Sequence, residues 1–269
     1  VDVLLGKSGD DSWGAMAIAL DYLEEGEPMP LYTEVFFEQT VKFQYPPSAA
    51  MEKAKQSGYA DLLDAQLPLG IRLLEVGCGT GQLSAFLSMT NRTAVGVDFS
   101  LNSLRKGSAF AARGGLRNAH FAQMDLFHLA FPDDTFDVVI CSGVLHHTAD
   151  AYRGFQSVCR VLKPGGYALI GLYNTYGRAM TTLRQWMVRL TGGRGRPQDT
   201  VLRQEGLDEA KRRVWFMDQY RHPHEQVFTV GDVLGWFART GIEYVNSIPA
   251  INGSDPLASG RLWEPADPG

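Results

Sequence analysis

The 269-residue sequence lacks several features that would point to particular classes of protein. It contains only three cysteines, and none lies in a CxxC pair, so a disulfide scaffold and a zinc knuckle both lack support. No apolar run approaches the ~18 residues that a membrane-spanning helix requires. The chain begins without the basic and apolar regions of a signal peptide, and with so few cysteines we expect a cytoplasmic protein.

Basic residues are also in deficit. The 25 Lys and Arg residues stand against 30 Asp and Glu residues, which gives a net charge of −5. This balance argues against broad electrostatic adhesion to nucleic acid or to an anionic membrane.

Apolar residues make up 45% of the chain, and they recur in short runs separated by helix-like stretches. This alternation indicates βαβ units and a parallel sheet. We predict strands at 72–76, 94–98, 120–124, 137–142 and 167–173, and helices that begin near Gln82, Leu101, Ala151 and Val230. The carboxyl ends of such strands border the ligand crevice of a doubly wound sheet, so functional side chains should gather there.

Two long segments interrupt the alternation, and each contains helical stretches broken by Pro or Gly. We predict a helical N-terminal cap at 1–70, the core at 71–174, a helical insert at 175–228, and the remainder of the core at 229–269. Within the last part, Thr229–Ser247 should form a helix and a strand. Because both caps are too long for plain connections, we expect them to cover the crevice together.

A glycine-rich segment follows the first predicted strand and reads Glu75-Val76-Gly77-Cys78-Gly79-Thr80-Gly81-Gln82. Glycine permits positive φ angles and lets a ligand approach the backbone without interference from Cβ atoms. A dinucleotide fingerprint would require Gly or Ala at position 82. The pattern E-x-G-x-G-x-G instead resembles the first motif of the class I S-adenosylmethionine-dependent methyltransferases. The resemblance implies that the loop cradles the cofactor, through Gly77, Cys78, Gly79, Gly81 and Gln82, and that Glu75 helps to order it.

An acid, Asp98, follows the second predicted strand, roughly 20 residues after the glycines. Its carboxylate can accept hydrogen bonds from both ribose hydroxyls of the cofactor, with Phe99 beside it. The alternative is that Asp98 or Ser100 caps the next helix, and Ser100 suits that role better.

The resemblance implies further cofactor contacts at the next two strands. Asp125 would accept the adenine amino group between Met124 and Leu126, although a loop aspartate can also bind its own backbone. Ser142 and Gly143 would lie close to the donor methyl group. The turn there reads Ser-Gly-Val-Leu-His-His instead of the Asn/Asp-Pro-Pro-Tyr/Phe of enzymes that methylate amino groups of DNA bases or glutamine, so that class is disfavoured.

Candidates for the remaining chemistry follow the fourth and fifth strands. His146 and His147 are candidate general bases because imidazole titrates near neutrality, although one of them could instead pack or bind backbone. Aromatic residues in both caps suit an apolar or ring-bearing acceptor, and an arginine could hold an anionic group on it. We predict a substrate site at Tyr173, Asn174, Tyr176, Arg178, Arg221, His222 and His224. His222-Pro223-His224 lacks helical ligand spacing, so no metal is expected.

These patterns together predict an α/β protein with a doubly wound, mostly parallel seven-stranded sheet that binds S-adenosyl-L-methionine and releases S-adenosyl-L-homocysteine. The expected reaction is methyl transfer to a small molecule, at oxygen before nitrogen or carbon. One alternative is an RNA or protein methyltransferase that uses the basic insert, where residues 184–213 hold eight bases and four acids; the net charge weighs against it. A second alternative is a binding or scaffold protein that keeps the fold without turnover.

Overall fold

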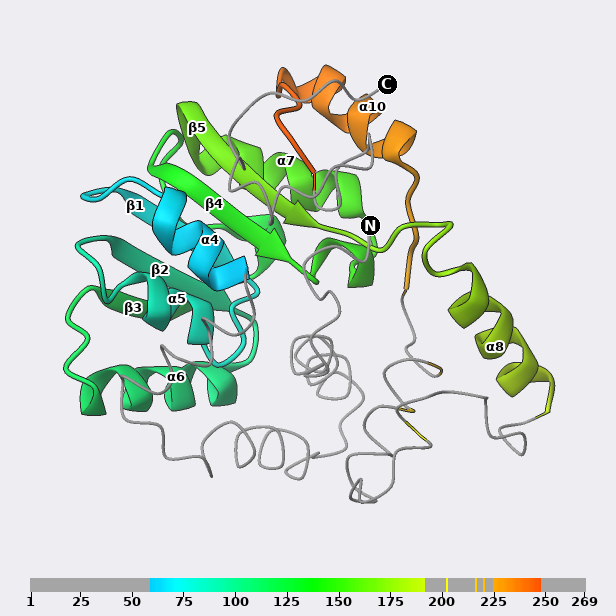
Figure 1. Ribbon diagram of the computed structural model, residues 1–269, viewed down its shortest axis with the longest axis horizontal. Coiled ribbons are helices and arrows are strands. Elements are labelled where there is room, and N and C mark those ends of the chain that lie inside the picture. Colours follow the sequence, from blue (N-terminus) through cyan, green and yellow to red (C-terminus); the bar gives the residue numbers. More distant parts are fainter. Residues whose placement is uncertain (1–58, 192–201, 203–215, 217–219, 221–224, 248–269) are drawn as a thin grey trace.

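The computed structural model describes residues 59–191, 202, 216, 220 and 225–247, and the account below is confined to them (Figure 1). Their centre is a parallel five-stranded sheet in the order β3-β2-β1-β4-β5. The strands are β1 (Arg72–Val76), β2 (Thr93–Asp98), β3 (Ala119–Gln123), β4 (Phe136–Ser142) and β5 (Leu162–Gly171).

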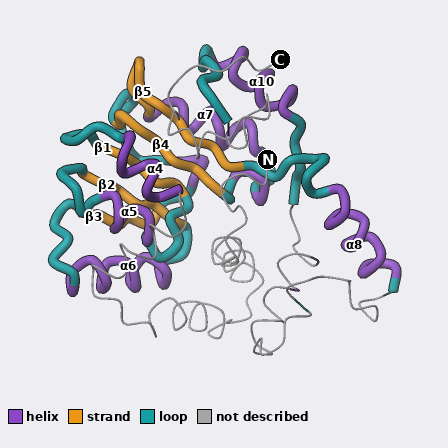
Figure 2. The backbone as a smooth tube through the Cα atoms, viewed as in Figure 1, coloured by secondary structure: helices purple, strands orange, loops and turns teal. Residues whose placement is uncertain are grey.

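Helices cover both faces of the sheet, as Figure 2 shows in purple. They are α4 (Tyr59–Gln66), α5 (Gln82–Leu87), α6 (Leu101–Arg113), α7 (Ala151–Val161) and α10 (Val230–Thr240), with single 3₁₀ turns η2 (Leu126–His128) and η3 (Leu145–His147) between elements. Helix α8 (Ala179–Leu190) lies apart from the sheet (Figure 1). No helix of the described ranges has the length and apolarity needed to cross a membrane.

Successive residues of the central strands point into two different cores. Leu74 and Val139 pack with α7 and α10 on one face, where Phe155, Val158 and Trp236 are buried. Leu73 and Val138 pack on the other face, with α4 and α5. The strands are therefore apolar at consecutive positions, as expected for a parallel sheet buried on both sides. The doubly wound arrangement predicted from the alternation is confirmed.

Most element boundaries agree with the sequence, and β5 departs furthest from it. The ladder begins at Leu162, which pairs with Phe136 across an irregularity, and it ends at Gly171 instead of Tyr173. The Pro-Gly-Gly stretch reads as a turn in the sequence, but Pro is tolerated at a bulge, where its missing N–H leaves no ladder bond unmade.

Five strands are present among the described residues, whereas seven were expected. Residues 242–247 follow α10 without joining the sheet. Two local bonds occur there, from the Tyr244 hydroxyl to Ser247 and from the Ser247 N–H to the Asn246 side chain, and such local bonds compete with a ladder. The predicted edge strand at 248–269 lies outside the described residues, as does most of the N-terminal cap.

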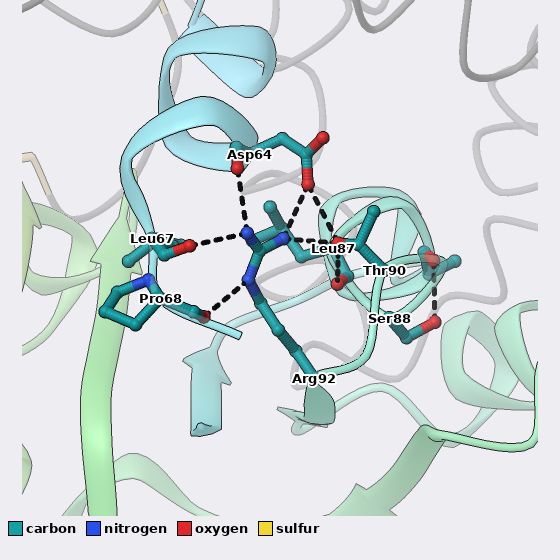
Figure 3. Close-up of polar contacts among 8 residues, drawn as sticks. Asp64, Leu67, Pro68, Leu87, Ser88, Thr90 and Arg92 are labelled. Atoms are coloured by element: carbon teal, nitrogen blue, oxygen red, sulfur yellow. Dashed lines mark hydrogen bonds and ion pairs between the residues drawn. The ribbon is translucent and has the colours of Figure 1, made fainter. Parts of the chain in front are cut away.

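A buried arginine fastens α4 to the core (Figure 3). Arg92, only 2% exposed, donates from Nε to the Pro68 carbonyl and from Nη2 to the carbonyls of Asp64 and Leu67. Its Nη1 contacts the Asp64 carboxylate and the Thr90 hydroxyl. The last carbonyls of α4 have no intrahelical donors, so this guanidinium closes the end of the helix.

Candidate functional site

The carboxyl ends of β1, β2 and β4 lie side by side, and the glycine-rich loop leaves β1 at this edge. Gly77, Gly79 and Gly81 have φ angles of +74°, +53° and +69°, which side chains rarely adopt. The N–H groups of Gly77 and Cys78 both donate to the Val97 carbonyl, at 2.8 and 3.0 Å. The loop is therefore fixed to β2 through its main chain.

Neighbouring side chains leave no room for a Cβ atom at two glycines of this loop. A Cβ at Gly81 would collide with the Phe121 ring, and one at Gly77 would collide with Val144. Helix α6 comes equally close, because a Cβ at its Gly107 would lie 2.6 Å from the Thr80 carbonyl oxygen. Three elements besides β1 thus shape the loop.

Glu75 connects the end of β1 to the start of α5. Its Oε2 accepts from the Ser84 N–H at 2.9 Å and also from the Ser84 hydroxyl. Burial raises the pKa of Glu75 to about 7, although the hydrogen bonds from Ser84 act in the opposite direction. Glu75 thus joins the strand before the loop to the helix after it.

Asp98 holds the loop from the second strand. Its Oδ2 accepts from the Gly79 N–H at 2.7 Å, and its Oδ1 accepts from the Ser100 N–H at 2.8 Å. Burial raises the pKa of this carboxyl, against the effect of these hydrogen bonds. The Phe99 backbone also hydrogen-bonds to this carboxylate, so of its four acceptor sites one stays open to a ligand hydroxyl. Ser100 caps α6 by accepting from the Ser103 N–H, as predicted.

The predicted adenine side of the site is more open. Asp125 caps η2, accepting from the Phe127 N–H at 2.9 Å and contacting His128 Nδ1 at 2.8 Å. The alternative of a loop aspartate binding its own backbone is therefore what the structure shows, and any contact with adenine must use the acceptor sites that remain. Phe99 stays 48% exposed at the end of β2. Met124 is half-buried and Leu126 is buried.

The residues around the loop fit a cofactor that is bound through main chain. Gly143 has a φ of +78°, and a Cβ there would meet nothing within 4 Å, so the end of β4 leaves space beside the loop. The Thr80 hydroxyl is buried in the loop without a hydrogen-bond partner, which suits a site for a polar ligand. Cys78 is fully buried, so only its main chain can take part, whereas Gln82 and Ser142 are half-buried.

The two histidines differ in their surroundings. His146 is 1% exposed and stacks on the Tyr173 ring, with centroids 3.7 Å apart and an interplanar angle of 27°. His147 is half-buried, and its centroid lies 4.3 Å from that of His146. A bound acceptor can reach His147 more readily, so His147 is the stronger candidate for a base.

The predicted substrate residues have diverse surroundings. Asn174 accepts at Oδ1 from the N–H groups of Tyr176 and Gly177, and Tyr176 is 79% exposed. Arg178 is buried and pairs with Glu225 at 2.8 Å, and its contact with a substrate stays a prediction. Arg221, His222 and His224 lie outside the described residues. Within the described ranges, no group of three or more side chains could hold a metal ion.

Four residues of this region were missed by sequence reasoning: Phe121, Val144, Glu225 and Gln226. Phe121 and Val144 looked like ordinary apolar residues, and no pattern shows which glycine an apolar side chain will face. The role of Glu225 has no local signal, because its partner Arg178 lies 47 positions away. Contacts of this length need the tertiary fold.

The sequence and the fold are similar to those of known methyltransferases. Residues 74–170 match the family model described as a methyltransferase domain. The chain is 33% identical over 128 residues to the 27-O-demethylrifamycin SV methyltransferase of Amycolatopsis mediterranei, covering 46% of this chain and 47% of that protein. It is 30% identical over 119 residues to the ubiquinone biosynthesis O-methyltransferase of Paracidovorax citrulli, covering 44% and 50%.

Among solved structures, PKMT2 from Rickettsia typhi in complex with AdoHcy matches with a TM-score of 0.54 and 16% identity, over 74% of this chain and 43% of that one. This likeness supports the Rossmann-like fold. The chain spans about half or less of the length of the curated relatives that it matches.

Proposed function

We propose, on the premise that residues 74–170 form a class I S-adenosylmethionine-dependent methyltransferase domain of the type 11 kind, that this protein transfers a methyl group to a small-molecule acceptor. The observation that carries the proposal is the main-chain cradle at the carboxyl edge. Asp98 bonds to the Gly77–Gly81 loop at Gly79, Glu75 joins the strand before the loop to α5, and a Cβ atom at Gly143 would meet nothing within 4 Å. The relatives that act on rifamycin and ubiquinone precursors support a small acceptor, with oxygen as the first candidate for the methylated atom.

Within this proposal the cofactor supplies an activated methyl group on a sulfonium. The loop would hold its methionine part, and the Asp98 carboxylate would accept from the ribose hydroxyls. Phe99, Met124 and Leu126 would flank the adenine, and Ser142 and Gly143 would border the reacting end. Because the electrophile is already activated, the protein mainly has to align the acceptor and exclude water.

A base is needed only if the acceptor loses a proton. We propose that His147 accepts this proton, because it lies after β4 and is only half-buried, whereas His146 is buried and Tyr173 covers one face of its ring. If so, His147→Gln should abolish most turnover while affinity for S-adenosylhomocysteine stays the same. Full activity in His147→Gln would remove this histidine from the mechanism.

We also propose that the two caps cover the acceptor. The support comes from α8, whose apolar side chains Met180, Leu183, Trp186, Met187 and Leu190 are all more than two-fifths exposed in the described structure. Several exposed apolar side chains on one helix favour burial of that helix against a ligand or another segment of the chain. Aromatic or apolar acceptors are consistent with such a surface.

Cofactor binding provides the test. The protein would be titrated calorimetrically with S-adenosylmethionine and S-adenosylhomocysteine, together with Gly79→Arg and Asp98→Ala. We expect both variants to lose at least about tenfold in affinity, equivalent to about 1.4 kcal/mol. Unchanged binding in both would contradict the proposal.

The matched control is Asp150→Ala. Asp150 caps α7 by accepting from the Arg153 N–H, so its loss should lower stability without affecting the cofactor. A screen of cell extract for transfer of a labelled methyl group would then identify the acceptor. Labelled RNA or protein in that screen would favour the alternative acceptors, and absence of any labelled product would favour a binding protein.

A further inference from the structure

At the end of the insert, the chain passes between η3 and the residues that follow β5. We call residues 225–228 the return segment. Its Gln226 N–H donates to the His146 carbonyl at 2.8 Å, and the Gln226 side chain donates to the Thr148 carbonyl at 2.9 Å. On its other side, the Phe228 N–H donates to the Tyr173 carbonyl at 2.8 Å. The return segment therefore joins the turn that carries both histidines to the end of β5.

The first residue of the return segment is also bonded to α8. Glu225 accepts from Arg178 Nη2 at 2.8 Å through one carboxylate oxygen, and from Gln185 Nε2 at 3.1 Å through the other. The side chains of Arg178 and Glu225 are only 7% and 9% exposed. The beginning of the insert and its end are thus held together by one buried ion pair.

The ion pair continues into a stack of rings. Arg178 Cζ lies 3.8 Å from the centroid of the Tyr173 ring, and Tyr173 stacks on His146. His147 lies edge-on to Tyr173, at 5.6 Å between centroids. A guanidinium is attracted to the face of an aromatic ring, so the position of Arg178 and the orientation of the rings depend on each other.

Stability alone gives a weak reason for this arrangement. Two buried charges lose their hydration, and apolar side chains of similar volume often stabilise a junction equally well. Directional bonds do something that apolar contacts do not, because they fix the angle at which the partners meet. The ion pair, the stack and the two bonds of Gln226 all converge on η3.

We propose that Glu225 and Gln226 are positioning residues that hold η3, and with it His147, at one place on the carboxyl edge. The proposal rests on the proposed methyl transfer with His147 as the proton acceptor. In this arrangement Glu225 acts through Arg178 and Tyr173, Gln226 acts through the carbonyls of His146 and Thr148, and neither touches the reacting atoms.

The first test uses Gln226→Met, which removes the side-chain donor but keeps the main-chain bond to His146. With the acceptor found in the labelled-methyl screen, we expect kcat to fall about 10- to 100-fold, because small displacements of a reacting group cost rates of this order. KM for the cofactor and calorimetric affinity for S-adenosylhomocysteine should stay within about twofold, since the loop is untouched. Gln156→Met, at an exposed site on α7, is the matched control and should change nothing.

The second test is spectroscopic and needs no acceptor. In the full chain labelled at histidine and saturated with S-adenosylhomocysteine, the resonances of His146 should carry a ring-current shift from the stacked Tyr173. We expect these resonances and those of His147 to move in Gln226→Met and in Glu225→Gln. Those of His120 and His128 should stay in place.

A third variant covers the risk that Glu225→Gln does not fold, since it leaves Arg178 buried without its carboxylate. Arg178→Met with Glu225→Leu removes both charges and should restore folding but not kcat. Recovery of full kcat in this double variant would show that Arg178 and Glu225 serve only to pack the junction, and it would overturn the inference. Unchanged kcat and histidine resonances in Gln226→Met would overturn it as well. If the unaltered chain does not bind S-adenosylhomocysteine, the result contradicts the proposed function instead.

Discussion

Glu75 is a buried acid that caps a helix from a distance. Gly81, the N-cap residue of α5, is left-handed and offers no side chain to the first turn. The Ser84 N–H would otherwise be without a partner, and the Glu75 carboxylate accepts from it across nine positions. The chain combines a glycine-rich loop with an ordered helix start, because the capping acid stands on the preceding strand.

This placement predicts a pH dependence of stability. The pKa of Glu75 is about 7 in the folded protein and 4.5 as its ordinary value, so between these limits the folded form keeps a proton that the unfolded chain has lost. The free energy of unfolding should therefore fall as pH rises from about 4.5 to about 7, by up to about 3 kcal/mol from this residue. Glu75→Gln should flatten that part of the profile, measured by urea unfolding at a series of pH values.

The control for this experiment is Glu243→Gln, an exposed acid after α10, which should leave the profile unchanged. The raised pKa of Asp98 acts in the same direction, so some slope should survive in Glu75→Gln. A profile as steep as that of the unaltered protein would show that Glu75 does not bury its charge.

At the scale of elements, the conformation of the glycine-rich loop depends on its local sequence, and its packing depends on tertiary contacts. The sequence indicates that glycines follow β1, and the left-handed angles explain why. At Gly81 a side chain is excluded by β3, because Phe121 fills the space beside this glycine. Gly165 has a similar φ of +75° but has nothing within 4 Å of a Cβ, so the two positions separate backbone strain from collision.

Gly81→Ala and Gly165→Ala should therefore differ in their effects. Both pay the strain of a left-handed alanine, on the order of 1 kcal/mol. Gly81→Ala should lose about 2 kcal/mol more through overpacking, and it should also weaken S-adenosylhomocysteine binding. Unfolding by urea and calorimetric titration measure the two effects.

Phe121→Leu in the Gly81→Ala background should recover part of the lost stability, because it opens space beside the new methyl group. Equal stability of the two single alanine variants would show that β3 can shift away and that the loop is less constrained than its packing indicates.

Helix boundaries are the part of the fold that sequence reasoning predicted best. Ser100 caps α6 as predicted, and Thr229 with Asp232 forms a capping box at the start of α10. These signals are local, since donor and acceptor lie three positions apart. The boundaries of β5 were predicted less well, because a strand ends where its neighbour stops pairing and not where its own residues change.

At the scale of the whole molecule, α4 is joined to the core by polar contacts, and Arg92 makes most of them. All five guanidinium donors are engaged with α4, with the turn after it, or with Thr90. Lysine has three donors and no planar fork, so it cannot reach these acceptors together. Arg92→Lys should cost about 2–4 kcal/mol in the free energy of unfolding, measured in urea.

Arg105→Lys provides the comparison, because Arg105 is exposed on α6 and its replacement should stay within about 0.5 kcal/mol. If both variants behave alike, α4 is held by its apolar contacts, with Leu63 and Leu67 as the principal ones. Hydrogen exchange in α4 would show whether the loss is local to that helix.

The sequence by itself determined the alternation of strands and helices, the glycine loop, the acids at the ends of β1 and β2, and the helix caps. Each of these depends on residues close together in the chain or on the fixed spacing of a βαβ unit. Only the tertiary structure decided that Arg178 pairs with Glu225, that Tyr173 covers His146, and that Arg92 closes α4. Such partners lie tens of positions apart, and burial makes their pairing obligatory only after the sheet has brought them together.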